Sequence, residues 1–268
     1  SEIIMSASSK GGLSLINQED LVNGSMIEDV MNSCGWGNFN SSELEKALAG
    51  KQVGMGISVG QAEEGLSGRS TPKDLRTLFE LTYLHFQDVK DDPDAFRNLI
   101  ESSRIQLENA EKLPMKSFQD SINVAIYQHH PRFIDIDLQK LEQVNYDTVK
   151  RLYKERFQSV GDFNFYFTGA INVDSLRTFT EQYLAPLPGL KGQRETYKDW
   201  GIKIVPGERN LRYNRQMETP QAYTIQVWSG DTPYTIEKKV TVAALGAALD
   251  QVLLNSIRED AGLSYSVS

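Results

Sequence analysis

The sequence predicts an α+β fold, in which a mainly antiparallel sheet carries helices on one face. Three observations lead to this prediction. Short segments alternate apolar and polar residues, as strands with one buried face do. Longer segments repeat apolar residues every three to four positions, as helices that pack on a core do. The order of these segments indicates one subdomain, which we place at residues 1–190.

The first elements are a strand, a helix, a short second helix and a hairpin. Residues 2–10 predict the strand, and residues 18–33 predict the helix. Asn40 or Ser41 caps the short helix, since both side chains can accept hydrogen bonds from free backbone N–H groups. Residues 51–70 alternate around several glycines, which predicts two strands joined by a turn.

The next helices have explicit start signals. Thr71 is a cap residue and is followed by Pro72, which fits the first helical position. Pro93 opens another long amphipathic helix in the same way. Residues 145–157 predict a further helix, and the alternating phenylalanines within residues 162–171 predict a strand.

A polar, turn-rich stretch separates this subdomain from the rest of the chain, and we place a linker at residues 191–207. Residues 208–268 predict the beginning of a second, similar subdomain. It consists of a strand over residues 222–230, a long helix that ends before Gly262, and the start of another strand. About 60 residues are marginal for an independent core. We therefore expect a truncated unit, with an open strand edge and a partly uncovered apolar helix face.

The charge of the chain excludes some classes of partner. There are 28 Lys and Arg residues against 36 Asp and Glu residues, which gives a net charge of −8. This balance argues against nucleic acid as a main partner. No uninterrupted apolar run approaches about 18 residues, so we expect no membrane span. The single cysteine, Cys34, excludes a disulfide framework.

The three histidines do not form a metal-binding pattern. No His-x-x-x-His pair is present, so no helix face carries two zinc ligands one turn apart. We interpret His85, His129 and His130 as packing or surface residues. Cys34 has no histidine at motif distance, and we interpret it as a small buried residue.

Four segments, in this order, resemble the pitrilysin-type (insulinase-like) zinc peptidases over nearly the whole chain. The segments are SKGGLSL, ELEKALAGKQVGMGISVGQAEEGLSGRSTPKDLRTLFELTYLHF, FYFTGAINVDSLRTFTEQYLAPLPG and LLNSIREDAGLSYSVS. The resemblance implies an enzyme of two related halves, each with two α+β subdomains. The first half carries zinc on a His-x-x-Glu-His helix. The second half lacks zinc and closes over the first to form a chamber for peptides.

This chain resembles part of the second half. The segment LVNGSMIEDVMNSCGWGNF falls where an active half would have its zinc helix, and it contains no histidine. The resemblance therefore implies that zinc belongs to the parent protein outside this chain, and that the chain alone binds no zinc and cleaves no peptide. The chain ends within a predicted strand, so we expect it to be a fragment of a longer protein.

Arg258 and Tyr265 are the candidate site residues. Taken alone, they fit a cation in the last turn of a helix and a half-buried anchor at the start of a strand. In the resembling family, an arginine and a tyrosine seven residues later reach the active site, where they hold substrate backbone and the developing oxyanion. A guanidinium and a phenol are hydrogen-bond donors, which suits that role.

Three functions stay open at this point. The chain is expected to be part of a zinc metalloendopeptidase that acts on peptides or unfolded protein, together with a zinc-bearing N-terminal half. Alternatively, it belongs to a non-catalytic subunit that presents substrate to a zinc-bearing partner subunit of a two-chain processing peptidase. The third function is an assembly protein of the same fold. The habit of the family favours the bacterial periplasm or cell envelope as the location.

Overall fold

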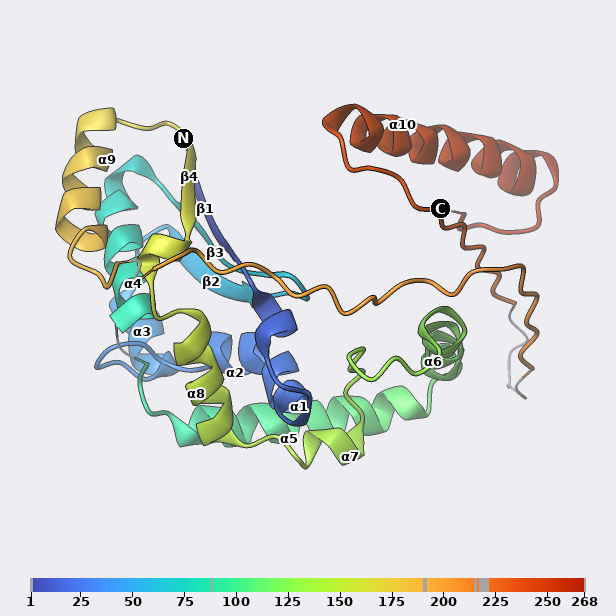
Figure 1. Ribbon diagram of the computed structural model, residues 1–268, viewed down its shortest axis with the longest axis horizontal. Helices are drawn as coiled ribbons and strands as arrows, with labels where there is room; N and C mark the ends of the chain where they lie inside the picture. The colour runs from blue at the N-terminus through green and yellow to red at the C-terminus, as the bar shows by residue number, and fades with distance from the viewer. Residues whose placement is uncertain (1, 88, 190–191, 215, 217–221, 268) are drawn as a thin grey trace. The chain divides into compact units, whose positions relative to one another are not determined.

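The computed structural model describes residues 2–87, 89–189, 192–214, 216 and 222–267. The chain divides into two compact units, which comprise residues 1–219 and residues 220–268 (Figure 1). Each unit is described by itself below.

One antiparallel sheet organises the first unit, with its strands in the order β2-β3-β1-β4 (Figure 1). The strands are β1 (Ile3–Lys10), β2 (Val53–Val59), β3 (Glu63–Ser70) and β4 (Asn164–Gly169). β1 lies in the middle and pairs with both β3 and β4. β2 and β3 form the predicted hairpin. The antiparallel pairing of all four strands confirms the predicted fold class.

Helices and helical turns connect the strands of the first unit. They are η1 (Gly12–Leu15), η2 (Gln18–Asp20), α1 (Leu21–Ser25), α2 (Ile27–Ser33), α3 (Ser41–Ala47), η3 (Pro72–Asp74), α4 (Leu75–Gln87), α5 (Pro93–Glu111), α6 (Pro114–Tyr127), α7 (Leu138–Leu141), α8 (Tyr146–Arg156), η4 (Val160–Asp162), α9 (Val173–Phe179) and η5 (Thr180–Leu184).

Side-chain caps explain where several of these helices begin. The Asn40 side chain accepts a hydrogen bond from the Glu43 N–H at 2.8 Å, and the Glu43 carboxylate accepts one from the Asn40 N–H at 2.8 Å. This reciprocal pair satisfies two otherwise free N–H groups at the start of α3. Thr71 caps η3, with Pro72 directly after it, as predicted. The helix expected over residues 18–33 is instead divided into η2, α1 and α2, with Met26 between the last two.

The core lies between one face of the sheet and the helices. β1 alternates buried and exposed positions, so that Ile3, Met5 and Ala7 face inward. Leu78 of α4 is fully buried, and a Cβ on Gly68 of β3 would lie 2.6 Å from its Cδ1 atom. The glycine is therefore what lets α4 approach the sheet closely. Burial of each large apolar side chain contributes about 1.5–3 kcal/mol relative to exposure.

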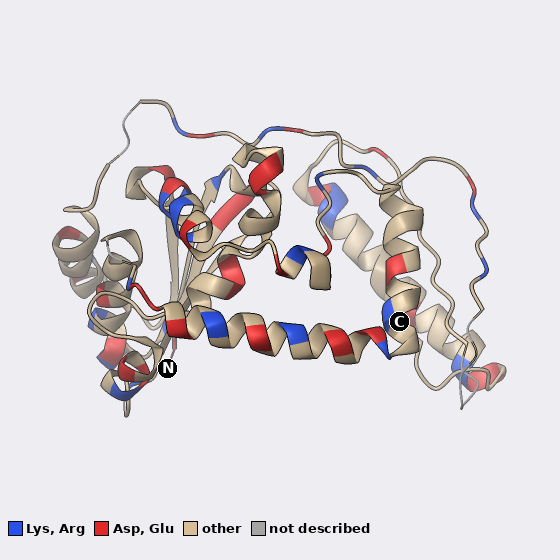
Figure 2. Cartoon of the chain, turned by 90° about the horizontal axis from the view of Figure 1, so that it is seen from below, with Lys and Arg blue, Asp and Glu red and all other residues tan. Residues whose placement is uncertain are grey.

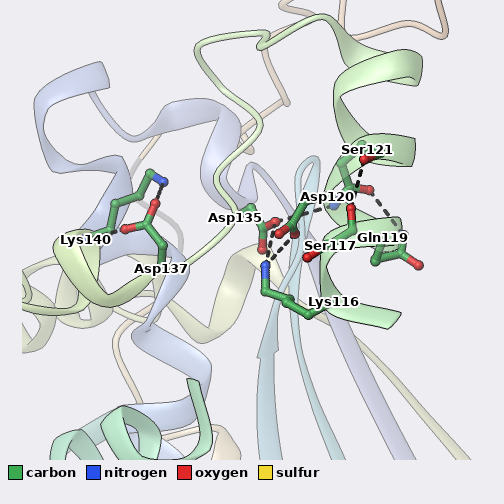
Figure 3. A network of polar contacts seen from close by, with 9 residues as sticks. Lys116, Ser117, Gln119, Asp120, Ser121, Asp135, Asp137 and Lys140 are labelled. Carbon is green, nitrogen blue, oxygen red and sulfur yellow. Dashed lines mark hydrogen bonds and ion pairs between the residues drawn. The ribbon is translucent and has the colours of Figure 1, made fainter. Parts of the chain in front are cut away.

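Two helices extend from this core with no buried residue, α5 and α6. Charges of both signs follow one another along α5 (Figure 2), and the neighbours Asp94 and Arg97 form an ion pair. α6 was not predicted from the sequence. Its Lys116 Nζ lies 2.5 Å from Asp120 Oδ1 and 3.7 Å from Asp135 Oδ2 (Figure 3). The first ion pair lies within α6, and the second attaches α6 to the segment that follows it.

The described part of the predicted linker is attached to the first unit. The Lys198 N–H donates to Ser14 Oγ at 2.8 Å, and Trp200 Nε1 donates to the Ser14 carbonyl oxygen at 2.8 Å. The Arg132 guanidinium lies over the Trp200 ring, 4.3 Å from its centroid. Farther along, the Val205 N–H donates to the Ile126 carbonyl of α6 at 3.0 Å.

The second unit contains one long helix. α10 (Ile236–Leu253) continues into the π-helical turn η6 (Leu254–Asp260). The chain then reverses at Gly262, whose φ of +59° lies in the left-handed region, and the Leu263 N–H donates to the Ile257 carbonyl at 3.0 Å. This helix end confirms the prediction. The strands expected over residues 222–230 and after Gly262 do not form among the described residues, which offer them no strand partner.

Large apolar side chains of this helix are exposed. They are Ile236, Val240, Val242, Leu245, Leu249 and Val252, each between 42 and 77% exposed. The helix Ile236–Asp260 is long enough to cross a membrane, and an 18-residue window within it has a mean hydropathy of 1.5, which is apolar enough by composition. The expectation of no membrane span is therefore corrected at the level of composition, because a window with a few polar residues can keep a high mean hydropathy although it contains no long uninterrupted apolar run. The core helix of a soluble domain has the same composition, so this is weak evidence for a span.

Candidate functional site

α1 and α2 occupy the segment where the resemblance places a zinc helix. Ile27, Val30 and Met31 of α2 are fully buried in the core. Glu28 and Asn32 point toward β2 and hydrogen-bond to its backbone. Within the part of the chain that the structure describes, no three His, Cys, Asp or Glu side chains form a group that could hold a metal ion. The donors on these helices therefore do not fit a zinc ion.

The sheet presents a second face, opposite the core, beside these helices. The alternate residues of the four strands point to it, and most of them are exposed. They are Ile4, Ser6, Ser8, Gly54, Gly56, Ser58, Gly65, Ser67, Arg69, Asn164, Tyr166 and Thr168. More than half are glycine or serine, so backbone and hydroxyl groups lie close to the surface. We call this surface the open face.

A buried charge cluster lies at the end of the sheet, under the Gly11–Gly12 turn. Glu64 is only 1% exposed, and its Oε2 atom accepts a hydrogen bond from the Gly12 N–H at 2.5 Å. Burial raises the pKa of Glu64, although the Gly12 N–H and the nearby Arg156 oppose the shift. Arg156 in turn binds Glu195 of the linker at 2.8 and 3.3 Å.

A buried arginine, Arg132, binds the helical turn that follows Gly11 and Gly12. Arg132 is 2% exposed, and its Nη2 atom donates to the carbonyls of Leu13 at 2.5 Å and Ile16 at 2.9 Å. Neither Glu64 nor Arg132 was singled out from the sequence. Each lies more than 50 positions from its partners, so no local spacing could have indicated these contacts.

His85 and Cys34 have structural roles. The His85 ring is buried, stacks on Trp36 at a centroid distance of 3.7 Å, and has Nδ1 2.7 Å from the Leu81 carbonyl oxygen. Burial lowers the pKa of His85 to about 4, so the ring is neutral at pH 7. Burial also raises the pKa of the Cys34 thiol. The structure confirms that these two residues are packing groups.

The candidate residues Arg258 and Tyr265 lie together in the second unit. Arg258 is in η6, and its guanidinium lies over the Tyr265 ring, 4.7 Å from the centroid. The reversal at Gly262 brings the tyrosine back against the helix end. Arg258 Nε is 3.4 Å from the exposed carboxylate of its neighbour Glu259, and Tyr265 is 82% exposed. Both polar groups thus reach solvent.

Comparison with known families finds a match for the C-terminal part of the chain. Residues 143–268 match the family described as the peptidase M16 inactive domain. The match covers the candidate pair Arg258 and Tyr265, and it confirms the resemblance inferred from the sequence. No curated protein matches the chain by sequence.

Solved structures share the fold at low sequence identity. The periplasmic protease PqqL from Escherichia coli has a TM-score of 0.77 at 18% identity, over 100% of this chain and 29% of that protein. A mutant of the ferredoxin protease FusC, in complex with Arabidopsis ferredoxin, has a TM-score of 0.60 at 16% identity, over 76% of this chain and 22% of FusC. A peptidase M16 inactive domain from Pseudomonas fluorescens has a TM-score of 0.56 at 14% identity, over 74% of this chain and 48% of that protein. The chain thus spans less than half of each.

Proposed function

Because residues 143–268 match the family described as the peptidase M16 inactive domain, we propose that the chain is part of the zinc-free half of a zinc metalloendopeptidase. In this proposal the chain encloses peptide substrate, and a zinc-bearing N-terminal half or partner subunit supplies the metal. The location is the bacterial periplasm, which the fold shared with the periplasmic protease PqqL supports.

The observation that carries the proposal is the open face beside the histidine-free helix α2. Residues on the open face are mostly small, so an extended peptide can approach the strands without displacing large side chains. Ser6, Ser67 and Thr168 offer hydroxyl groups that can donate to or accept from peptide groups. Such a surface binds backbone rather than one particular side chain, as an enclosure for varied peptides requires.

We assign Arg258 and Tyr265 to substrate and transition-state contact. Attack of a metal-activated water on a peptide carbonyl, the chemistry that zinc supplies when bound, builds negative charge on the carbonyl oxygen. The Arg258 guanidinium and the Tyr265 hydroxyl are donors of the kind that stabilises such charge. Their mutual ring contact at 4.7 Å holds the two side chains near each other before substrate arrives.

The test uses the complete parent protein. Arg258→Ala and Tyr265→Phe should each lower kcat/KM for peptide hydrolysis by roughly ten- to a thousandfold, as loss of an oxyanion donor does. Tyr234→Phe is the matched control, because Tyr234 is similarly exposed in the same unit. Turnover within twofold of wild type in both site variants would remove the pair from the mechanism.

A reconstitution experiment distinguishes the two arrangements of the zinc-bearing half. This chain alone should cleave no peptide. If cleavage returns only when a separately encoded zinc-bearing protein is added, the chain belongs to a substrate-presenting subunit. If the parent polypeptide cleaves peptide by itself, and a chelator stops the cleavage, both halves lie in one chain.

A further inference from the structure

β2 is an outer strand of the sheet, and its outer edge pairs with no other strand in the part of the chain that the structure describes. In an antiparallel pair, alternate residues direct both backbone groups toward the partner strand or away from it. The Gly60 N–H donates to the Glu63 carbonyl in the hairpin. Residues of β2 that lie an even number of positions from Gly60 therefore direct their backbone groups toward β3. The other residues of β2 direct their N–H and C=O groups away from β3, toward the outer edge. They are Val53, Met55, Ile57 and Val59.

Asn32 of α2 satisfies both outward groups of Ile57. The Ile57 N–H donates to Asn32 Oδ1 at 2.9 Å, and Asn32 Nδ2 donates to the Ile57 carbonyl oxygen at 3.1 Å. A residue of a neighbouring antiparallel strand would form the same two bonds. A Cβ on Gly56 would already touch Asn32 Oδ1 at 3.4 Å, so the adjacent glycine leaves room for the amide.

Two carboxylates bond to backbone N–H groups on either side of this pair. Glu28, one helical turn before Asn32 on α2, accepts from the Val59 N–H at 3.3 Å. Asp74 accepts from the N–H of Gln52, just before β2, at 3.0 Å. Among the residues that the structure describes, no side chain caps the outward backbone groups of Val53 and Met55, which form the uncapped stretch of this edge.

We propose that α2 closes the β2 edge against strand addition, with the Asn32 amide taking the place of a residue of a neighbouring strand. An extended peptide could then pair only with Val53 and Met55, which is too short a stretch for a stable added strand. Exposed edges pair readily with other chains, and proteins limit this by covering them.

Amide hydrogen exchange of the unmodified chain is the first test. Ile57 and Met55 lie on the same edge of the same strand, so their N–H groups differ mainly in whether a side chain accepts from them. The Ile57 amide should exchange at least about tenfold more slowly than the Met55 amide. Equal exchange rates at the two positions would overturn the proposal, because Asn32 would then not hold the edge.

Peptide binding by a variant is the second test. The probe is a fluorescent octapeptide of alternating threonine and valine, and its analogue with alternate N-methyl groups lacks the donors for pairing. The double variant Asn32→Ala with Glu28→Ala should bind the probe about tenfold more tightly than wild type, as about two added backbone bonds predict. It should not bind the N-methylated analogue more tightly.

Asn172→Ala is the matched control. Asn172 also accepts a backbone hydrogen bond, from Ser175 at 2.9 Å, but at the start of α9 and away from the edge. It should bind the probe as wild type does. Unchanged affinity in the double variant, with a circular dichroism spectrum like that of wild type, would contradict the proposal. The test involves no peptidase activity, so its outcome is independent of the proposed function.

Discussion

Substitution of Gly12 by alanine should destabilise the first unit strongly. Gly12 is buried and has a φ of +54°, in the left-handed region. A Cβ there would be closest to the Gly60 carbonyl oxygen, and would lie 2.7 Å from the Glu63 N atom and 2.9 Å from the Glu63 carbonyl oxygen. All three are backbone atoms of the β2–β3 hairpin, so no side-chain rotation can relieve the contacts. The turn and the hairpin must separate instead.

The size of the effect follows from two contributions. An L-residue in the left-handed region costs about 1–2 kcal/mol, and the smaller entropy of the unfolded alanine chain offsets about 0.4–1 kcal/mol of this. Separation of the turn also breaks the bond from the Gly12 N–H to Glu64, and an unsatisfied buried group costs about 1–3 kcal/mol, or more when charged. With displacement of the hairpin, Gly12→Ala should cost about 3–5 kcal/mol.

Gly50→Ala is the matched control, because Gly50 has a φ of +80° and a Cβ added there would meet no atom within 4 Å. It should cost only about 1 kcal/mol. Both variants are measured by urea unfolding in a Trp228→Phe background, so that fluorescence reports on Trp36 and Trp200 of the first unit. If Gly12→Ala costs no more than Gly50→Ala, the close packing of the turn on the hairpin is refuted.

Three further predictions concern titration and exposure. The pKa of His85 is lowered to about 4 by burial, so stability should fall as pH drops from about 6.5 toward 4, by up to about 1.4 kcal/mol per pH unit; His85→Phe should remove this fall from urea unfolding curves. The pKa of Glu64 is raised by burial, so its contribution is full below the usual carboxyl pKa and is lost as pH rises through the raised value. Glu64→Gln should therefore flatten the decline at rising pH, and an unchanged slope would contradict it. Arg258→Ala removes an exposed contact with Tyr265, so the free energy of unfolding should change by at most about 1 kcal/mol in a melting experiment.

Local patterns account for the parts of the fold that the sequence predicted. The alternation in residues 51–70 predicts the hairpin because one face of each strand is buried in the core. Thr71 and Pro72 predict a helix start because capping depends on residues within one turn. For the same reason, the glycine that ends the long helix of the second unit was recognised at Gly262.

The remaining features depend on contacts between distant residues. α6 has no buried residue and a mixed pattern, so only Pro114 at its first position could have indicated it. The strand expected over residues 222–230 alternates correctly but has no partner among the described residues, and a strand pattern cannot supply one. Asn32 reads as an ordinary polar residue on a helix surface, and only the path of β2 shows what its amide binds.

The charges gathered under the Gly11–Gly12 turn have a consequence for how this sequence can diverge. Glu64, Arg156 and Glu195 come from a strand, a helix and the linker, and Arg156 forms an ion pair with Glu195 and lies near the carboxylate of Glu64. Loss of Arg156 would leave the two carboxylates near each other without their counter-charge, whereas loss of one carboxylate leaves Arg156 with the other. Substitutions at these three positions should therefore occur together during evolution, because paired replacements are tolerated where single ones destabilise the fold. A sequence that has only one of two paired replacements would be less stable than either end point. A double-mutant cycle measures this loss as the interaction free energy between the two positions.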